Sequence, residues 1–147
     1  MTIRPAVKSD SKAWEEMRQE LWPSPAGEHK EEIAAYFGEG IREPLEVLLA
    51  VDDAGKAVGF VELNIRPFAE GCYSGRVAYI EGWFVRPDAR RKGIGHALIQ
   101  AAEEWGRSQR CTEMGSDAVL TNELSIALHG KFGFEVVERQ VCFRKGL

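Results

Sequence analysis

The sequence predicts an α+β fold in one domain over residues 1–147, with about four helices and a mixed, mostly antiparallel central sheet. Three observations support this prediction. The hydrophobic period changes repeatedly between helical and strand spacing along the chain. A short Ala-Gly turn joins two strand-like runs, which is typical of an antiparallel hairpin. The third helical run also follows one predicted central strand and precedes another.

The first segments predict a strand and a helix. Residues 2–6 are typical of a strand. Asp10 or Ser11 can cap the helix that follows, and Pro23 and Pro25 end it. The apolar face of this helix carries Ala13, Trp14, Met17 and Leu21.

A second helix and a hairpin come next. Residues 29–38 have helical spacing and end at a glycine, either Gly38 or Gly40. Residues 45–53 and 57–65 are predicted as paired strands, and a loop then leads to the next strand. The remaining elements are a long strand over 76–85 that Pro87 stops, a helix that ends near Trp105, a strand over 111–119, a helix over 122–132 and two short strands within 133–145.

Charge and cysteine content narrow the class of protein. The net charge is −4, which argues against nucleic acid as the main partner and mildly favours a cationic one. There is no apolar run of membrane-spanning length, no apolar signal core at the start, and no CxxC pair among the three cysteines. We therefore expect a cytoplasmic protein with reduced thiols. The histidines have no metal-ligand spacing, so we expect no metal.

Positive charge gathers at the predicted start of the third helix. Arg90, Arg91 and Lys92 precede Gly93 and Gly95. Free N–H groups at a helix start bind anions, and glycines let an oxyanion reach the backbone. This pattern predicts a phosphate or pyrophosphate site, although a tight turn with a solvated basic rim is the alternative. The motif is neither a P-loop nor a dinucleotide-binding fingerprint.

The same stretch resembles a known signature. The spacing Arg90-x-x-Gly93-x-Gly95, directly after "YIEGWFV", resembles the acyl-coenzyme-A motif of the GNAT superfamily of N-acetyltransferases, and "NELSIALHGKFGFE" resembles its closing motif. The resemblance implies a GNAT-like fold with splayed central strands and acetyl-CoA as cosubstrate. Mid-strand Gly82 then predicts a bulge or a close backbone approach. The cofactor-binding residues that the resemblance implies are Trp83, Phe84, Val85, Arg90, Arg91, Lys92, Gly93, Ile94, Gly95, His96 and Asn122.

Four further segments, "ELWPS", "FAEGC", "YIEGWFV" and "EMGSD", resemble the aminoglycoside 6′-N-acetyltransferases within that superfamily. This narrower resemblance implies that Trp22 and Phe68 form apolar walls for sugar rings. Phe68 stands where the subgroup has a tyrosine, so one hydrogen bond would be absent. The carboxylates implied to bind or deprotonate ammonium groups are Glu81, Asp117 and Glu138.

An amine must lose a proton to attack a thioester, and a carboxylate can accept that proton. Glu81 and Asp117 are the candidate bases, and the residues alone do not choose between them. His129 occupies the position where many relatives carry the tyrosine proposed to protonate the leaving thiolate, and a histidine can transfer protons near neutral pH.

We therefore expect a direct acetyl transfer to the 6′-amine of an aminoglycoside, conferring antibiotic resistance, with relatives often forming homodimers. One alternative is a GNAT acetyltransferase for a polyamine, a small amine metabolite or a protein amine. A second is a non-catalytic acyl-CoA-binding regulatory module.

Overall fold

The computed structural model describes all 147 residues. No helix is both long and apolar enough to cross a membrane. The elements, in chain order, are β1 (Thr2–Pro5), α1 (Ser11–Leu21), α2 (Glu28–Tyr36), β2 (Glu46–Val51), β3 (Ala57–Arg66), β4 (Val77–Val85), α3 (Ile94–Ser108), β5 (Met114–Ser116) and α4 (Glu123–Lys131), with short 3₁₀ turns at Lys8–Asp10 and Pro87–Ala89.

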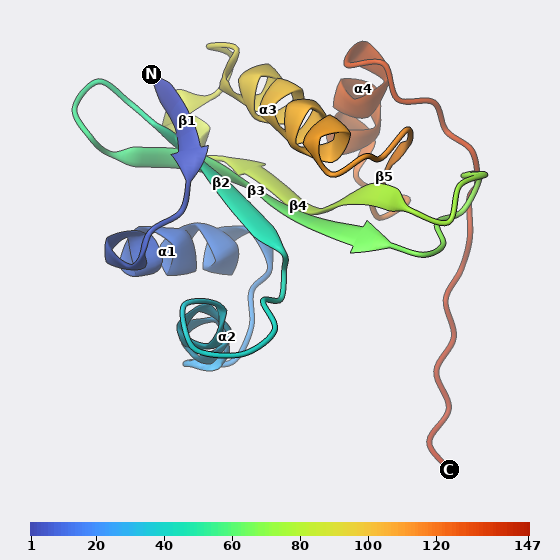
Figure 1. Cartoon of the computed structure of the whole chain (residues 1–147), viewed down its shortest axis with the longest axis horizontal. Helices are drawn as coiled ribbons and strands as arrows, with labels where there is room; N and C mark the ends of the chain where they lie inside the picture. The colour runs from blue at the N-terminus through green and yellow to red at the C-terminus, as the bar shows by residue number, and fades with distance from the viewer.

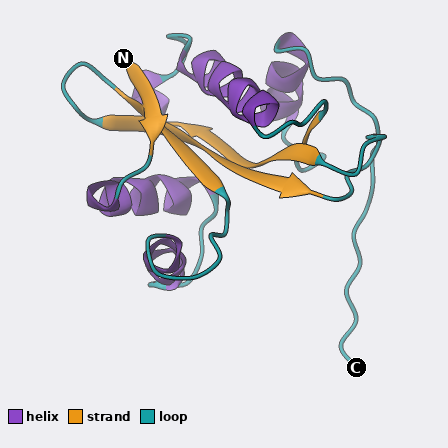
Figure 2. Cartoon of the chain, viewed as in Figure 1, coloured by secondary structure: helices purple, strands orange, loops and turns teal.

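The strands form one sheet in the order β1-β2-β3-β4-β5. The first three pairs are antiparallel, and β4 and β5 are parallel. Helices α1 and α2 lie on one face, while α3 and α4 lie on the other (Figure 1). The same layers are visible as purple helices on both sides of the orange sheet in Figure 2. The predicted α+β class with a mostly antiparallel sheet is confirmed.

Each face of the sheet has its own apolar core. On one face, α1 and α2 bury Trp14, Met17 and Ile33 against Phe60. On the other, α3 buries Leu98, Ile99 and Ala102 against β3 and β4. The helical spacing of these apolar positions is what directs one stripe of each helix onto the sheet.

The start of α1 differs from the prediction in one detail. Asp10 is the N-cap residue, but its side chain makes no bond to the helix. It instead accepts two hydrogen bonds from Arg4, at 2.8 and 3.0 Å. A bidentate charged pair outweighs a single capping bond.

The C-terminal prediction was wrong. Residues 135–147 form neither of the two expected strands and make no backbone hydrogen bond. After α4 the chain passes the loop before β4, where Val137 lies against Gly71, and then runs away from the rest of the molecule (Figure 1). A segment in which apolar and polar residues alternate forms a strand only when a neighbouring strand supplies hydrogen-bond partners. No strand of this chain pairs with residues 135–147.

Candidate active site

The loop before α3 exposes a row of backbone donors. The amides of residues 91–96 donate to no backbone carbonyl or side chain. Two residues in the loop have left-handed backbone, Arg91 with φ 64° and Gly93 with φ 80°. Such a bend points successive N–H groups to one side, and the helix start adds partial positive charge. The arrangement is suited to a phosphate group.

The two glycines of this loop have different reasons to be glycine. Gly93 is in open space, but its positive φ disfavours any side chain. Gly95 faces the sheet, where a Cβ would lie 3.2 Å from Cζ2 of Trp83. Gly93 thus allows the bend of the loop, and Gly95 leaves room for the ring of Trp83.

The basic side chains of the loop are partly anchored. Arg90 donates from Nε to the Val85 carbonyl at 2.8 Å, and Lys92 donates from Nζ to the Asp88 carbonyl at 3.2 Å. Arg91 makes no ion pair. All three side chains belong to exposed residues, so their charges surround the free amides without blocking them.

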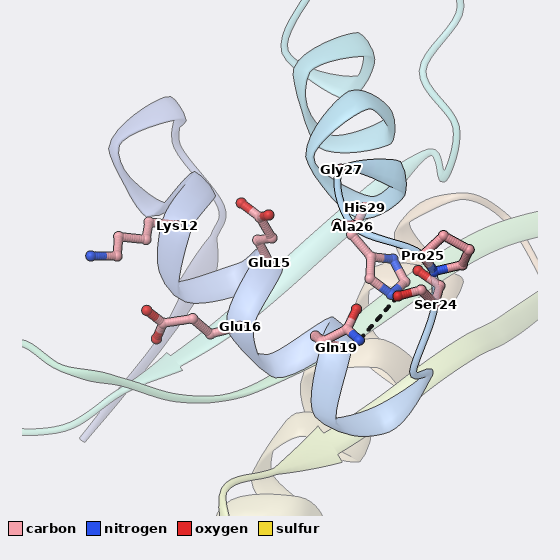
Figure 3. A pocket seen from close by; sticks show the side chains of 9 residues that line it. All are labelled: Lys12, Glu15, Glu16, Gln19, Ser24, Pro25, Ala26, Gly27 and His29. Carbon is pink, nitrogen blue, oxygen red and sulfur yellow. Dashed lines mark hydrogen bonds between the residues drawn. The ribbon is translucent and has the colours of Figure 1, made fainter.

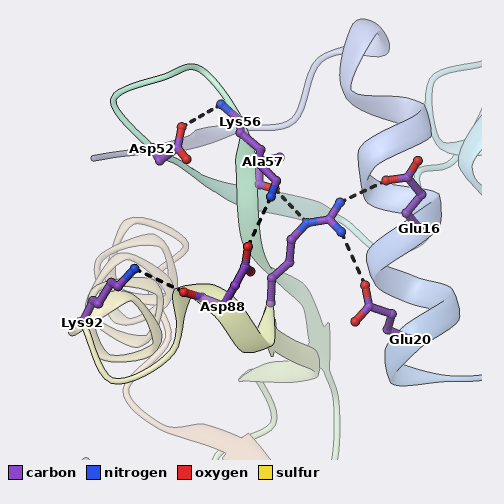
Figure 4. Close-up of polar contacts among 8 residues, drawn as sticks. Glu16, Glu20, Asp52, Lys56, Ala57, Asp88 and Lys92 are labelled. Carbon is purple, nitrogen blue, oxygen red and sulfur yellow. Dashed lines mark hydrogen bonds and ion pairs between the residues drawn. The ribbon is translucent and has the colours of Figure 1, made fainter.

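A second network joins the end of β4 to α1. Arg86 donates to the Ala57 carbonyl at 3.1 Å and pairs with Glu16 and Glu20 at 3.1 and 3.4 Å (Figure 4). In the same view Lys56 pairs with Asp88 at 3.4 Å. The segment that leads into the glycine loop is therefore joined to α1, which Trp22 follows directly.

The edge of β4 beside this loop is open. Strand β5 pairs only with Ala78–Ile80, while β3 continues along β4 to Val85. Residues 81–85 therefore have a partner on one side alone, and the other edge can pair with an extended, amide-bearing chain. The family resemblance implies this splay between the central strands.

A bulge turns Glu81 toward the α1–α2 side of the sheet. In the β3–β4 register Glu62 faces Gly82 and Leu63 faces Ile80, which leaves Glu81 without an opposite residue. Because an extra residue breaks the alternation of faces, Glu81 and Gly82 lie on the same face. The predicted bulge is present, one residue before Gly82.

Trp22 fills the space that Gly82 leaves. A Cβ at Gly82 would lie 2.3 Å from Cη2 of Trp22, so the close approach is made by this ring. The ring is also held by Arg18, whose guanidinium lies 5.3 Å from its centroid, and the Trp22 carbonyl lies 2.7 Å from Nε2 of His29.

Gly82→Ala should displace the Trp22 ring and raise the acceptor KM about tenfold, because an apolar contact of this size is worth about 1–3 kcal/mol. Steady-state kinetics at saturating acetyl-CoA measure the effect. Gly75→Ala is the matched control, since a Cβ there meets nothing within 4 Å. An unchanged acceptor KM would show that Trp22 is not a wall of the acceptor site.

An acidic cavity of about 890 Å³ opens between α1, α2 and the β3–β4 pair. Its walls include Trp22 and carry more acidic than basic side chains. The charged lining residues are Glu28, Glu32, Glu43, Glu62 and Glu81, with Arg18 and Arg66. We call this cavity the acceptor cleft.

A second cavity, of about 600 Å³, lies between α1 and the start of α2 (Figure 3). Its residues include Glu15, Glu16 and Gln19, and none lies on the sheet. Gln19 closes one side by donating to the Ser24 carbonyl at 3.2 Å. The cavity is therefore separate from the open edge of β4.

A buried ion pair supports the floor of the acceptor cleft. Glu62 is 2% exposed, lies 2.8 Å from Nε of Arg18 and accepts a hydrogen bond from Trp14 Nε1 at 2.9 Å. Burial raises the pKa of Glu62, and Arg18 opposes that rise. Arg18 also pairs with Glu32 at 2.5 Å and lies over the rings of Trp14 and Trp22, so it links the floor of the cleft to its aromatic wall.

The two predicted base candidates belong to one connected group. Both oxygens of Glu81 accept from Arg66, at 2.9 and 2.7 Å, and Asp117 accepts from the Tyr79 hydroxyl at 2.9 Å. The Arg66 guanidinium lies 3.6 Å from the Tyr79 ring centroid. Sequence reasoning missed Arg66 and Tyr79. The only signal was that Arg66 ends the strand that pairs with β4.

Phe68 lies on the loop between β3 and β4 and is 68% exposed. Glu113, just before β5, holds this loop by accepting from the amides of Tyr73 and Ser74, at 2.9 and 2.6 Å. These bonds, mainly the one from Ser74, lower the pKa of Glu113. The ring of Phe68 is thus presented to solvent from an anchored loop.

Glu113→Gln should destabilise the protein at about pH 7, where the native carboxylate is ionised, but not at about pH 2. A lowered pKa contributes stability above the ordinary value of about 4.3, and that stability is lost as pH falls through the native value. Urea unfolding of both proteins at several pH values measures this. A difference that stays constant with pH would contradict the anchor.

His129 contacts two serines. Its Nδ1 donates to the Ser125 carbonyl at 2.7 Å, since a carbonyl can only accept. In the neutral ring Nε2 is then an acceptor for the Ser116 hydroxyl, 2.8 Å away. Ser116 is the last residue of β5, so this pair lies where β4 and β5 separate. The sequence pointed to His129 but not to Ser116.

The remaining predicted site residues, Asn122, His96 and Glu138, lie outside the group formed by Glu81, Arg66, Tyr79 and Asp117. Asn122 caps α4, with its Oδ1 accepting from the Ser125 amide at 3.1 Å, which leaves its side-chain NH₂ available. His96 stacks on Phe132, with 4.6 Å between ring centroids. Glu138 is exposed on the extended tail and forms no ion pair, so the chain does not bring it to Glu81 and Asp117. No group of three or more potential metal ligands is present.

Comparisons with known proteins agree with this geometry. Residues 14–134 match the model of the Acetyltransferase (GNAT) family. The chain is 50% identical to an aminoglycoside N(6′)-acetyltransferase type 1 of Klebsiella aerogenes, covering 99% of this chain and 96% of that protein. It is 36% identical to the protein of the same name from Acinetobacter baumannii, covering 100% and 99%.

Solved structures give the same result. The structure of AAC(6′)-Iy with the bisubstrate analogue CoA-S-monomethyl-acetylneamine has a TM-score of 0.89 and 34% identity, covering 99% of this chain and 98% of that one. The apo 6′-N-acetyltransferase AAC(6′)-IG of Acinetobacter haemolyticus has a TM-score of 0.90 and 35% identity, covering 100% and 99%. The predicted resemblance to the GNAT superfamily is confirmed, and so is the narrower resemblance to its aminoglycoside 6′-N-acetyltransferases. This chain belongs to the GNAT family of acetyltransferases.

Proposed function

We propose that this acetyltransferase transfers the acetyl group of acetyl-CoA to the 6′-amine of aminoglycosides and so confers resistance to them. One observation supports this most directly. The open edge of β4 connects a loop of free amides to an acidic cleft lined by Glu81 and Trp22, and Tyr79 and Arg66 link Asp117 to Glu81. The names of the relatives in the preceding comparisons identify the same reaction in those proteins.

The donor half of the site would work through the backbone. The free amides of residues 91–96 bind the pyrophosphate, with Arg90, Arg91 and Lys92 around it. The pantetheine arm pairs with the edge of residues 83–85 as an added strand. A backbone N–H of this edge polarises the thioester carbonyl and stabilises the oxyanion that forms on attack. Asn122 and His96 complete the cofactor side.

The acceptor half would position an amine beside the thioester. Trp22 and Phe68 contact the sugar rings, and Glu81 and Asp117 hold the ammonium group. Asp117 is the better proton acceptor, because Tyr79 engages one of its oxygens while Arg66 engages both oxygens of Glu81. After Asp117 takes the proton, the nitrogen lone pair forms the C–N bond. As the C–S bond breaks, the nitrogen gives up its second proton, and Nε2 of His129 takes up this proton and passes it to the thiolate.

A thiol-release assay with a panel of amines tests the proposal. Turnover of a 6′-amino aminoglycoside, with no turnover of its 6′-hydroxy analogue, is the expected result. Turnover of polyamines or peptides alone would assign the chain to another amine. Binding of acetyl-CoA without turnover of any amine would indicate a regulatory module.

We also propose that the protein is a homodimer in which each tail adds a strand to the partner. Residues 135–147 have no backbone partner and expose Val136, Val137, Val141 and Phe143. Strand β5 is a short edge strand. Unpaired edges and unpaired strand-like segments favour pairing between chains. Such pairing would bury the apolar residues and move Glu138 to a folded surface.

Light scattering measures this assembly. The double variant Val141→Asp/Phe143→Asp should be monomeric, because two charges would be buried in the interface. Gln140→Asp, on the same tail, is the control and should stay dimeric. A monomeric native protein, or a dimeric double variant, would contradict strand exchange.

The proposal also covers the location of the enzyme in the cell and its domain organisation. All three cysteines are free, and a cytoplasm keeps thiols reduced, so we place the enzyme in the cytoplasm. We also treat residues 1–147 as a single catalytic domain, of which the family match covers residues 14–134.

A further inference from the structure

Arg66 contacts the two groups that organise the acidic side of the site. It is the last residue of β3, and its Nε and Nη2 donate to the two oxygens of Glu81 at 2.9 and 2.7 Å. The guanidinium carbon of the same side chain lies 3.6 Å from the centroid of the Tyr79 ring. The side chains of Arg66 and Glu81 are 38% and 24% exposed, so the pair lies at the wall of the acceptor cleft and still meets solvent.

Tyr79 links Arg66 to the second carboxylate, Asp117. Its hydroxyl donates to Oδ2 of Asp117 at 2.9 Å, across from β4 to the end of β5. Burial, with the Asp117 hydrogen bond, raises the pKa of Tyr79 well above its usual range. The hydroxyl therefore keeps its proton at working pH and remains a donor to Asp117.

The chemistry of this group favours arginine over lysine. A guanidinium is planar, so it can bind both oxygens of a carboxylate with its edge while it stacks on a ring with its face. A lysine ammonium supplies the same charge but neither the two-point contact nor the flat face. The shape of the side chain matters here as much as its charge.

Two nearby carboxylates would also repel each other without a cation between them. Glu81 raises the pKa of Arg66, chiefly by accepting its hydrogen bonds, and the charge of Asp117 adds to the rise. Arg66 makes no hydrogen bond or ion pair with the cofactor loop of residues 86–96. Its polar and cation–π partners, Glu81 and Tyr79, belong to the acceptor side.

We propose that Arg66 is a positioning residue for the acceptor carboxylates, fixing Glu81 directly and Asp117 through Tyr79. This inference rests on the proposed function, in which those carboxylates hold and deprotonate the amine. Catalysis requires the base close to the attacking nitrogen, and a displacement of about 1 Å can cost about 100-fold in rate. Arg66 would set this distance without touching the reacting atoms.

The test compares Arg66→Lys, Arg66→Gln, Tyr79→Phe and the double variant Arg66→Gln/Tyr79→Phe. Arg42→Gln is the matched control, because Arg42 also stacks on a tyrosine, 4.7 Å from the Tyr36 ring centroid, but outside this group. Steady-state kinetics give kcat and both KM values with a 6′-amino aminoglycoside, and thermal unfolding checks folding.

Both Arg66 variants should lower kcat about 10- to 100-fold, with the acetyl-CoA KM and the melting temperature like those of Arg42→Gln. Tyr79→Phe should lower kcat less. The double variant should be no slower than Arg66→Gln, because Tyr79 acts in the same unit.

Native kinetics in Arg66→Lys would overturn the inference, since they would show that charge alone suffices. Additive losses in the double variant, or a raised acetyl-CoA KM, would also overturn it. If the native enzyme fails to turn over the aminoglycoside, the proposed function fails instead. The variants are then measured on whichever amine is a substrate, and the same outcomes decide the role of Arg66.

Discussion

Asp117→Asn should lower kcat about 100-fold or more while leaving the acetyl-CoA Kd unchanged, because general base catalysis contributes about 10² to 10⁴ to the rate. The amide is the same shape as the carboxylate and still has an oxygen for the Tyr79 hydroxyl, 2.9 Å away in the native protein. It cannot accept the proton of the ammonium group. The fall in kcat therefore reports the loss of a proton acceptor and not a change in the shape of the side chain.

Single-turnover kinetics and calorimetric titration with acetyl-CoA separate the two quantities. Asp53→Asn is the control, since Asp53 pairs with the chain's amino group far from the cleft. A parallel loss of cofactor affinity would remove Asp117 from the acceptor side. A near-native kcat would transfer the role of base to Glu81 or to water.

Gly93→Val should weaken acetyl-CoA binding about 100-fold. The residue has φ 80°, which costs a β-branched side chain about 1–2 kcal/mol, so the loop will leave this conformation. The amides of residues 91–96 would then no longer point together at the pyrophosphate. Each lost hydrogen bond to a charged group costs about 1.5–3 kcal/mol, so one or two of them account for the effect.

Gly130→Val on α4 is the matched control, since a Cβ there also meets nothing within 4 Å. Cofactor affinity is measured by calorimetry, and circular dichroism confirms that both variants are folded. Native affinity in a folded Gly93→Val protein would show that the loop does not grip the phosphates.

Much of the fold follows from the sequence because local signals decide it. Pro23 ends α1 and Pro87 ends β4, as the fixed φ of proline requires. The hairpin turn forms around Asp52, whose Oδ1 accepts from the amides of Ala54 and Lys56 at 3.0 and 2.8 Å. These signals act within a few residues and do not depend on distant partners.

The predictions that failed depend on distant partners. The tail alternates like a strand, but a strand exists only if another backbone pairs with it, and this chain offers none. The predicted strand over 111–119 is reduced to Met114–Ser116 because β4 bends away at the bulge.

In the candidate site, too, some residues are identifiable from local sequence and others only from contacts between distant segments. Glu81, Asp117 and the glycine loop are recognisable from the order of residues along the chain. Arg66 and Ser116 acquire importance only through contacts across strands, with Glu81 and His129 respectively. Gly82 was predicted to allow a close approach, but only the folded chain shows that the Trp22 ring makes it.

Backbone amide NMR during titration with coenzyme A measures the central contact of the donor site most directly. If the loop grips the pyrophosphate, the amide signals of residues 91–96 shift strongly downfield, and those of residues 83–85 shift as the pantetheine arm pairs with β4. If coenzyme A binds while these amides keep their positions, the diphosphate lies elsewhere and this account of the enzyme is wrong.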